Sequence, residues 1–183
     1  MVDVKPGDRV LTKDHYGSPF YDEVIMMIHR SQHQIVDNYV QVIMSTNNKL
    51  VLSRLHLVLL QDGSSKFSKD LSRGDKMLTY DSLTKRMQSS SVIDVRFVTR
   101  IGMFAPLTKS GTIIVDDVYV SCYALFPSHR VSHAVFWLWR CVYDLFKYFD
   151  PTVGSVVGSD TIHWYPKFFK ERLQMFNVFH YIL

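Results

Sequence analysis

The sequence VKPGDRVLTKD at residues 4–14 returns as LSRGDKMLTYD at residues 71–81. Both copies contain Gly-Asp, then a basic residue, an apolar pair and Thr, and both end on Asp. A strand-like segment follows each copy, at residues 21–28 and 91–98. Gly-Asp before a strand is also a common turn sequence, but matches over the whole of both segments favour a duplication. Two copies are too few for a solenoid. They predict a pseudo-twofold fold in which two similar halves wrap around each other.

Residues 1–125 have the pattern of β structure throughout. Short segments rich in Val, Ile, Thr, Tyr and Phe alternate with turn sequences that contain Gly, Pro, Asn and Asp. No helical periodicity lies between these segments, so we expect an all-β fold. The predicted strands are residues 20–28, 39–45, 49–60, 91–100 and 112–123.

The composition excludes several classes of protein. Of the 183 residues, 47% are hydrophobic and 21% are charged, which excludes disorder throughout the chain. The net charge is only +4 and no run of Lys and Arg exceeds two residues, so we expect no nucleic-acid partner. Cys122 and Cys141 are the only cysteines, so there is no disulfide framework. The pair His29 and His33 is a weak metal signal, and we expect neither a metal nor a cofactor.

The character of the sequence changes after residue 126. Residues 131–149 (VSHAVFWLWRCVYDLFKYF) predict an apolar helix with one narrow polar stripe, formed by His133, Arg140, Asp144 and Lys147. Residues 152–159 resemble a linker, and residues 163–183 predict a second amphipathic helix. Such helices cover a sheet, bind a partner, lie in a membrane interface or hold a hydrophobic ligand. We favour the lipid and interface alternatives over simple core packing.

Few residues are candidates for chemistry. His56 ends the sequence Ser53-Arg54-Leu55-His56 inside an apolar run, Cys122 closes the segment 112–123, and His29 follows the segment 20–28. From spacing alone, a single histidine in a β segment is more often a hydrogen-bonded core residue than a catalyst. By the same reasoning, Cys122 is a small buried hydrophobic residue.

Several short sequence blocks, taken in their order along the chain, make these residues stronger candidates for catalysis. They are GDRVL at residues 7–11, SRLH at 53–56, GMFAPLT at 102–108, GTIIVD at 111–116, SCYA at 121–124 and IHWY at 162–165. With these blocks the chain resembles the C-terminal autoprocessing part of hedgehog and hedgehog-related proteins, a member of the Hint (hedgehog/intein) class. The resemblance implies an all-β, pseudo-twofold Hint core at residues 1–125. It also implies a helical region that recognises a sterol or another adduct at residues 126–183.

The resemblance implies a two-step reaction. A cysteine at the start of the domain attacks the preceding carbonyl and forms a thioester, helped by the histidine of a Thr-x-x-His motif. A carboxylate then activates a sterol hydroxyl, which attacks the thioester and releases the upstream signalling domain with the lipid attached. On this chain the catalytic histidine is His56, and Ser53 stands in place of the threonine. Cys122 is expected beside the active site, where it would pair with the nucleophile under oxidation, and Cys141 is expected to be a packing residue.

The chain departs from this pattern at two points. It begins inside the usual start of the domain, so we expect the nucleophilic cysteine to be absent and the chain to be inactive alone. The position of the sterol-activating carboxylate is occupied by His29, whose neutral imidazole can also accept a hydroxyl proton. The resemblance implies no cofactor, a sterol or lipid as substrate, and a location in the secretory pathway. Its partners would be an upstream domain of the same precursor and a membrane interface.

Two alternatives stay open. The first is a degenerate, non-catalytic Hint-like module that binds a lipid or a membrane surface. The second is a secreted interaction domain unrelated to inteins, which would require all the block matches to be coincidence. In the adduct region, the expected lipid-binding residues are His163, Trp164, Tyr165, Phe168 and Phe169.

Overall fold

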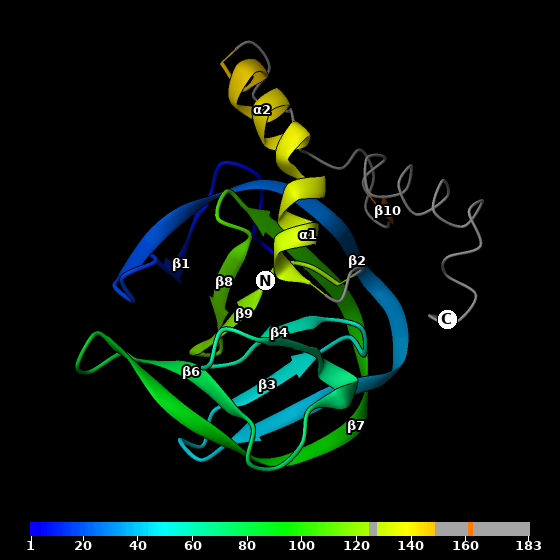
Figure 1. Cartoon of the computed structure of the whole chain (residues 1–183). Coiled ribbons are helices and arrows are strands. Elements are labelled where there is room, and N and C mark those ends of the chain that lie inside the picture. The colour runs from blue at the N-terminus through cyan, green and yellow to red at the C-terminus, as the bar shows by residue number, and fades with distance from the viewer. Residues whose placement is uncertain (125–127, 149–160, 163–183) are drawn as a thin grey trace.

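Two long strands, β2 (Pro19–Met44) and β7 (Arg86–Thr108), organise the fold (Figure 1). The computed structural model describes residues 1–124, 128–148 and 161–162. Most of these residues are in strands, as the sequence predicts. The other elements are β1 (Arg9–Lys13), β3 (Lys49–Leu52), β4 (Leu57–Leu59), β5 (Ser65–Phe67), the 3-10 helix η1 (Ser68–Asp70), β6 (Lys76–Asp81), β8 (Thr112–Val115), β9 (Val118–Ser121), α1 (His129–Val135), α2 (Trp137–Phe146) and β10 (Thr161–Ile162).

The main sheet has the strand order β1-β2-β7-β6-β9-β8, and β3 and β10 also pair with β2. β2 and β7 run antiparallel from the pair Val24 and Thr108 to the pair Met44 and Val92, so each strand passes through both halves of the fold. The segments 20–28 and 39–45 were expected as separate strands, but both belong to β2. The turn-like residues between them form bulges within one strand, where the register with β7 shifts.

The duplicated sequence forms duplicated structure. Gly7 donates a backbone hydrogen bond to Val24 O, and Gly74 donates the equivalent bond to Val92 O, both at 2.8 Å. The two glycines have φ angles of 93° and 96°, a left-handed conformation that side chains disfavour. One copy leads into β1, which pairs with β2, and the other leads into β6, which pairs with β7. The predicted pseudo-twofold duplication is therefore confirmed.

Three predicted elements are wrong in their boundaries. Residues 49–60 form β3 and β4 with a turn between them, and residues 112–123 form the hairpin of β8 and β9. The hairpin turns at Asp116 and Asp117, whose φ angles of 49° and 62° lie in the left-handed region that aspartate tolerates. The predicted helix at 131–149 is instead two helices, α1 and α2, which meet at Phe136.

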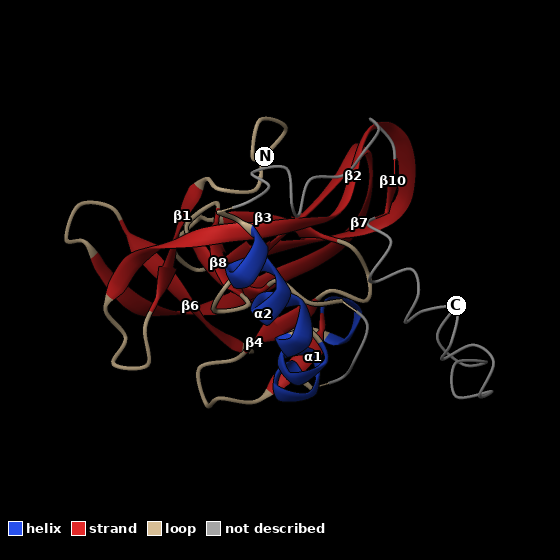
Figure 2. Ribbon diagram, turned by 90° about the horizontal axis from the view of Figure 1, so that it is seen from above, coloured by secondary structure: helices blue, strands red, loops and turns tan. Residues whose placement is uncertain are grey.

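The helices α1 and α2 cover the β fold at one side (Figure 2). Phe136, Trp139 and Tyr143 are 3–4% exposed and belong to the same hydrophobic cluster as the strands. The lipid and interface alternatives were favoured over core packing for this region, but these three side chains pack in the core. The packing instead continues across the predicted boundary at residue 125.

The polar stripe of α2 lies beside its buried apolar face, where it bonds to the edge of the β fold. Lys109 Nζ lies 2.6 Å from Asp144 Oδ1, and the Tyr143 hydroxyl donates to Glu23 Oε1 at 2.9 Å. Burial raises the pKa of Glu23, but the hydrogen bonds from Tyr143 and Lys109 outweigh it and leave the pKa below its ordinary value. Lys147 Nζ adds an ion pair to Glu23 at 3.4 Å. The outward face therefore carries the apolar residues Trp137, Leu138 and Leu145, each more than half exposed.

Among the described residues, none of the helices combines the length and the apolar character needed to cross a bilayer. The predicted linker at 152–159 and the predicted helix at 163–183 lie outside the described residues. The five expected lipid-binding residues, His163, Trp164, Tyr165, Phe168 and Phe169, lie outside them as well.

Candidate functional site

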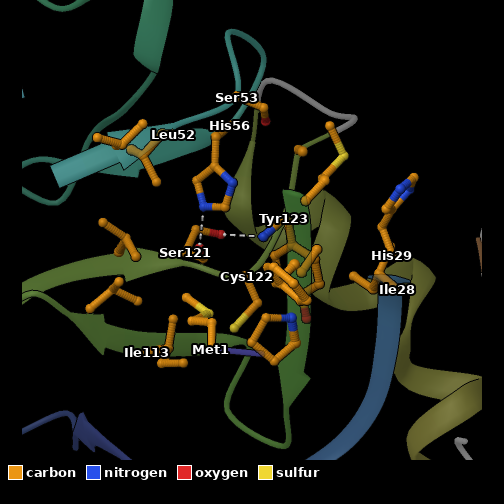
Figure 3. Close-up of a pocket in the computed structure, with 18 of the residues that line it drawn as sticks. Met1, Ile28, His29, Leu52, Ser53, His56, Ile113, Ser121, Cys122 and Tyr123 are labelled. Atoms are coloured by element: carbon orange, nitrogen blue, oxygen red, sulfur yellow. Dashed lines mark hydrogen bonds between the residues drawn. The ribbon is translucent and has the colours of Figure 1, made fainter. Parts of the chain in front are cut away.

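One largely apolar cavity brings the four predicted site residues together (Figure 3). Its volume is about 510 Å³, and its walls come from β2, β3, β7, β8 and β9. His56, Ser53, Cys122 and His29 all line it, although they are spread over much of the chain. Met1 lines the same cavity. Ligand sites of proteins span about 300–1,000 Å³ and are mostly apolar with a few polar groups, and this cavity has that character.

His56 is placed by a turn that a neighbouring serine stabilises. The His56 N–H donates to Ser53 O at 2.9 Å, which closes the turn. Ser68, fully buried in η1, donates its hydroxyl to Ser53 O at 2.6 Å and its backbone N–H to His56 O at 2.8 Å. Both ends of the turn are therefore bonded to one buried residue. No sequence motif indicated that Ser68 helps to position His56.

The His56 ring has a defined orientation and tautomer. Its Nε2 lies 2.7 Å from the backbone oxygen of Ser121, as the dashed line in Figure 3 marks. A carbonyl oxygen only accepts, so Nε2 carries the proton and Nδ1 of the neutral ring keeps its lone pair. Burial lowers the pKa of His56, against the opposing effect of the Ser121 hydrogen bond. The ring is therefore neutral near pH 7, with Nδ1 able to accept a proton.

Cys122 directly follows β9 and is buried, with 4% exposure. Its Sγ lies 3.7 Å from the Thr108 hydroxyl. Burial raises the pKa of Cys122 to about 11, so the group is a thiol rather than a thiolate near neutral pH. The predicted position of Cys122 beside His56 agrees with the cavity lining, whereas its predicted secondary role stays a prediction. Cys141 was expected to be a packing residue, and this is wrong because it is exposed on α2.

We expect alkylation to distinguish the two cysteines. Iodoacetamide should modify Cys141 at the rate of an ordinary exposed thiol and Cys122 about two orders of magnitude more slowly, because little Cys122 thiolate exists near neutral pH. Peptide mapping by mass spectrometry measures both rates on the same chain. Both cysteines should react at similar rates in denaturant. Equal rates in the folded chain would contradict the buried position of Cys122.

His29 lies across the cavity from His56 (Figure 3). Its Nε2 lies 3.1 Å from Gln34 Oε1, and its backbone lies between Ala105 of β7 and Ile162 of β10. The two-residue strand β10 therefore brings Ile162, the first residue of the IHWY block, beside His29. His33 is exposed. The described residues contain no group of three or more His, Cys, Asp or Glu side chains that could hold a metal ion.

The sequence did not indicate a polar network that joins α1 and α2 to the end of β9. His129 Nδ1 lies 3.0 Å from Ser121 Oγ, and His133 Nδ1 lies 2.9 Å from the Tyr123 hydroxyl. Gly111, with a φ of 74°, leaves room for this contact, because a Cβ there would lie 2.6 Å from the Tyr123 hydroxyl. The helical stripe containing His133 was visible in the sequence. Its partners on the β fold were not.

The known proteins that are similar to this chain include hedgehog proteins of several animals. The chain is 32% identical to the Tiggy-winkle hedgehog protein of Danio rerio, over 90% of this chain and 42% of that protein. It is 29% identical to the Indian hedgehog protein of Gallus gallus, over 88% and 40%. It is 30% identical to the protein hedgehog of Drosophila yakuba, over 87% and 37%. The chain thus spans about two-fifths of the length of these relatives.

Solved structures with a similar fold include inteins. An intein from a hyperthermophile superposes with a TM-score of 0.51 at 13% identity, over 62% of this chain and 70% of the intein. The gp41-1 intein superposes with a TM-score of 0.51 at 14% identity, over 65% and 83%. At these identities the likeness establishes the fold alone. The model of the Hint module matches residues 1–175, nearly the whole chain, and this match shows that the chain belongs to the Hint module family.

Proposed function

We propose that this chain is the autoprocessing module of a hedgehog-like precursor. In this reaction it would transfer an upstream domain first to a cysteine and then to a lipid hydroxyl. The observation that carries the proposal is the single cavity shared by His56, Ser53, Cys122 and His29. The identity of 30–32% to two hedgehog proteins supports the same proposal. The upstream domain and the secretory pathway belong to this proposal because the resemblance to hedgehog proteins implies them.

The first step needs a nucleophilic cysteine. Cys122 is unsuited to this role, because burial keeps it a thiol, and Cys141 lies exposed on α2. We place the nucleophile in a segment joined to Met1, because Met1 lines the cavity and a preceding peptide would start there. His56 would take the proton of the thiol on Nδ1, the sulfur would attack the carbonyl carbon of the preceding residue, and the C–N bond would break as His56 passes that proton to the leaving nitrogen. The product is a thioester.

The second step needs an acceptor with a hydroxyl group. His29 would remove the hydroxyl proton, the oxygen would attack the thioester carbon, and the sulfur would leave and take up that proton. The apolar lining and the volume of the cavity support a lipid acceptor such as a sterol. β10 supports a role for residues 163–183 in binding it, because that strand pairs with β2 at His29. His163, Trp164, Tyr165, Phe168 and Phe169 remain the proposed lipid contacts.

A fusion of a reporter domain, a cysteine-containing segment and the full chain tests the proposal. Dithiothreitol should release the reporter, and a sterol in vesicles should release it with the mass of the sterol attached. Replacing the added cysteine by alanine should abolish both reactions. His29→Ala should abolish release by the sterol and preserve release by dithiothreitol, whereas His33→Ala, in the same strand but exposed, should change neither. A folded fusion that dithiothreitol does not cleave would refute the autoprocessing proposal.

The outward face of α2 favours a second candidate function, a non-catalytic module that binds a lipid surface. Trp137, Leu138 and Leu145 together expose a large apolar area to water, which is unfavourable without an apolar partner. The same fusion separates the two functions. Vesicle binding without cleavage by thiol or sterol supports the second candidate. Cleavage that requires the added cysteine supports the first.

A further inference from the structure

A second cavity, on α1 and α2, shares no lining residue with the first. It is open to solvent and has a volume of about 520 Å³. The residues that line it are His129, Arg130, His133, Ala134, Trp137 and Arg140. None of these residues is acidic. The polar part of the cavity therefore consists of two imidazoles and two guanidinium groups.

Hydrogen bonds on the inner side favour one tautomer of His133. Arg140 Nη1 donates to the Tyr123 hydroxyl oxygen at 3.2 Å, and a guanidinium group cannot accept. The hydroxyl proton of Tyr123 is then directed to His133 Nδ1, at 2.9 Å. Because Nδ1 accepts, the proton of the neutral ring is on Nε2. The outer nitrogen of His133 is a donor.

The same reasoning applies to His129. Ser121 Oγ accepts a hydrogen bond from Tyr123 N–H at 3.1 Å, and its own proton is directed to His129 Nδ1 at 3.0 Å. With the Ser121 hydroxyl donating to Nδ1, His129 likewise carries its proton on Nε2. The two rings stack with centroids 5.8 Å apart and an interplanar angle of 19°. Within the part of the chain that the structure describes, neither Nε2 has a hydrogen-bond partner.

Among the described residues, no acidic side chain neutralises the positive charge of this cavity. No described carboxylate forms an ion pair with Arg130 or Arg140, and Arg140 bonds only the neutral Tyr123 hydroxyl and the His133 backbone oxygen. Asp144, the nearest acidic residue along α2, pairs with Lys109 and Lys147 instead. Burial, followed by the charges of Arg140 and His129, lowers the pKa of His133 to about 4. Every polar group available to a ligand is thus a hydrogen-bond donor, in a site that disfavours more positive charge.

We propose that this cavity binds a phosphate-type oxyanion, either free or as a lipid headgroup, between Arg130, Arg140 and the Nε2 atoms of His129 and His133. Tetrahedral oxyanions accept hydrogen bonds on every oxygen and match guanidinium groups well. The spacing of His129 and His133, four residues apart on a helix, would also suit a metal ion. The two arginines in the same lining repel a cation, so an anion suits the cavity better than a metal ion. This inference does not depend on the autoprocessing reaction.

Titration of the full chain with inorganic phosphate tests the proposal. In NMR spectra, phosphate should shift the ring-proton signals of His129 and His133, which His129→Gln and His133→Gln assign. Arg130→Gln should weaken binding about tenfold. Arg130 is exposed and forms no hydrogen bond with a described residue, so this variant should fold.

Arg86→Gln is the matched control, because it removes the same charge from an exposed position in the hairpin of β6 and β7, away from α1 (Figure 1). Its affinity for phosphate should stay within about twofold. Vesicles of phosphatidylcholine with and without phosphatidic acid identify the source of the anion. Shifts with phosphate, or only with vesicles that contain phosphatidic acid, support the site if Arg130→Gln weakens them. Equal losses of affinity in the two arginine variants would overturn the proposal, and so would the absence of any shift of the histidine signals with phosphate or vesicles. A parallel titration with zinc would also overturn it if zinc shifts these signals and phosphate does not.

Discussion

Replacing His56 by alanine is expected to slow release of the upstream domain by dithiothreitol about 10²–10⁴-fold, the range that a positioned acid–base group contributes. Three observations support an effect of this size. His56 lines the cavity, its ring is oriented by Ser121 O at 2.7 Å, and its lowered pKa keeps it neutral near pH 7. The reporter fusion described above provides the assay, with the released reporter followed on a gel over time.

His15→Ala is the matched control for this prediction. His15 is exposed in the turn between β1 and β2 and does not line the cavity, so this variant should cleave at the parent rate. His56→Gln adds a second test, because a glutamine amide can still donate to Ser121 O but cannot exchange a proton. It should be as slow as His56→Ala while circular dichroism shows a native fold. Cleavage at the parent rate by either folded variant would remove His56 from the mechanism.

Replacing Trp139 by alanine is expected to lower the free energy of unfolding by about 3–5 kcal/mol. Trp139 is 4% exposed and packs in the cluster that contains the strand residues, so its removal leaves a cavity in the shared core. The loss would be a large part of the total stability of a domain of this size, which is about 5–15 kcal/mol. Denaturant unfolding followed by circular dichroism gives the difference directly.

Leu138 provides the comparison, because it is the preceding residue on the same helix and is 54% exposed. Leu138→Ala should change the free energy of unfolding by no more than about 0.5 kcal/mol. If the two variants lose equal stability, α2 does not contribute to the core. The region after residue 125 would then be separable from the β fold, as its sequence first indicated.

Much of the fold was predictable from the sequence because its determinants are local. In the repeated turn, glycine supplies the left-handed φ, and the aspartate carboxylate accepts a backbone hydrogen bond from the residue three positions earlier. These bonds are Lys5 N–H to Asp8 Oδ2 at 3.0 Å and Ser72 N–H to Asp75 Oδ2 at 2.9 Å. Each bond joins residues of one four-residue segment, so the sequence of each copy is sufficient to predict its turn. The sequence blocks indicated His56, Ser53, Cys122 and His29 in the same way, one short segment at a time.

The arrangement of the site depended on contacts between distant segments. His56 and the carbonyl that orients it, on Ser121, are 65 residues apart. Ser68 forms hydrogen bonds to the turn that ends at His56, and it belongs to a short helix that no sequence pattern predicted. Strand ends were missed where apolar residues flank a turn on both sides, as at residues 53–56. In such cases hydrophobicity is similar in the strand and the turn, so only the pairing partners define the boundary.

The orientation of α2 was decided by tertiary structure alone. The sequence correctly indicated that its polar residues share one face, because helical periodicity is a local property. A polar stripe normally faces water, and here it lies at the edge of the contact with the β fold, beside the buried Trp139 and Tyr143. Glu23 and Lys109 lie on the β fold opposite this stripe, where they pair with Lys147 and Asp144. Periodicity determines which side chains lie together, but the charges on the opposing surface determine whether that face points inward.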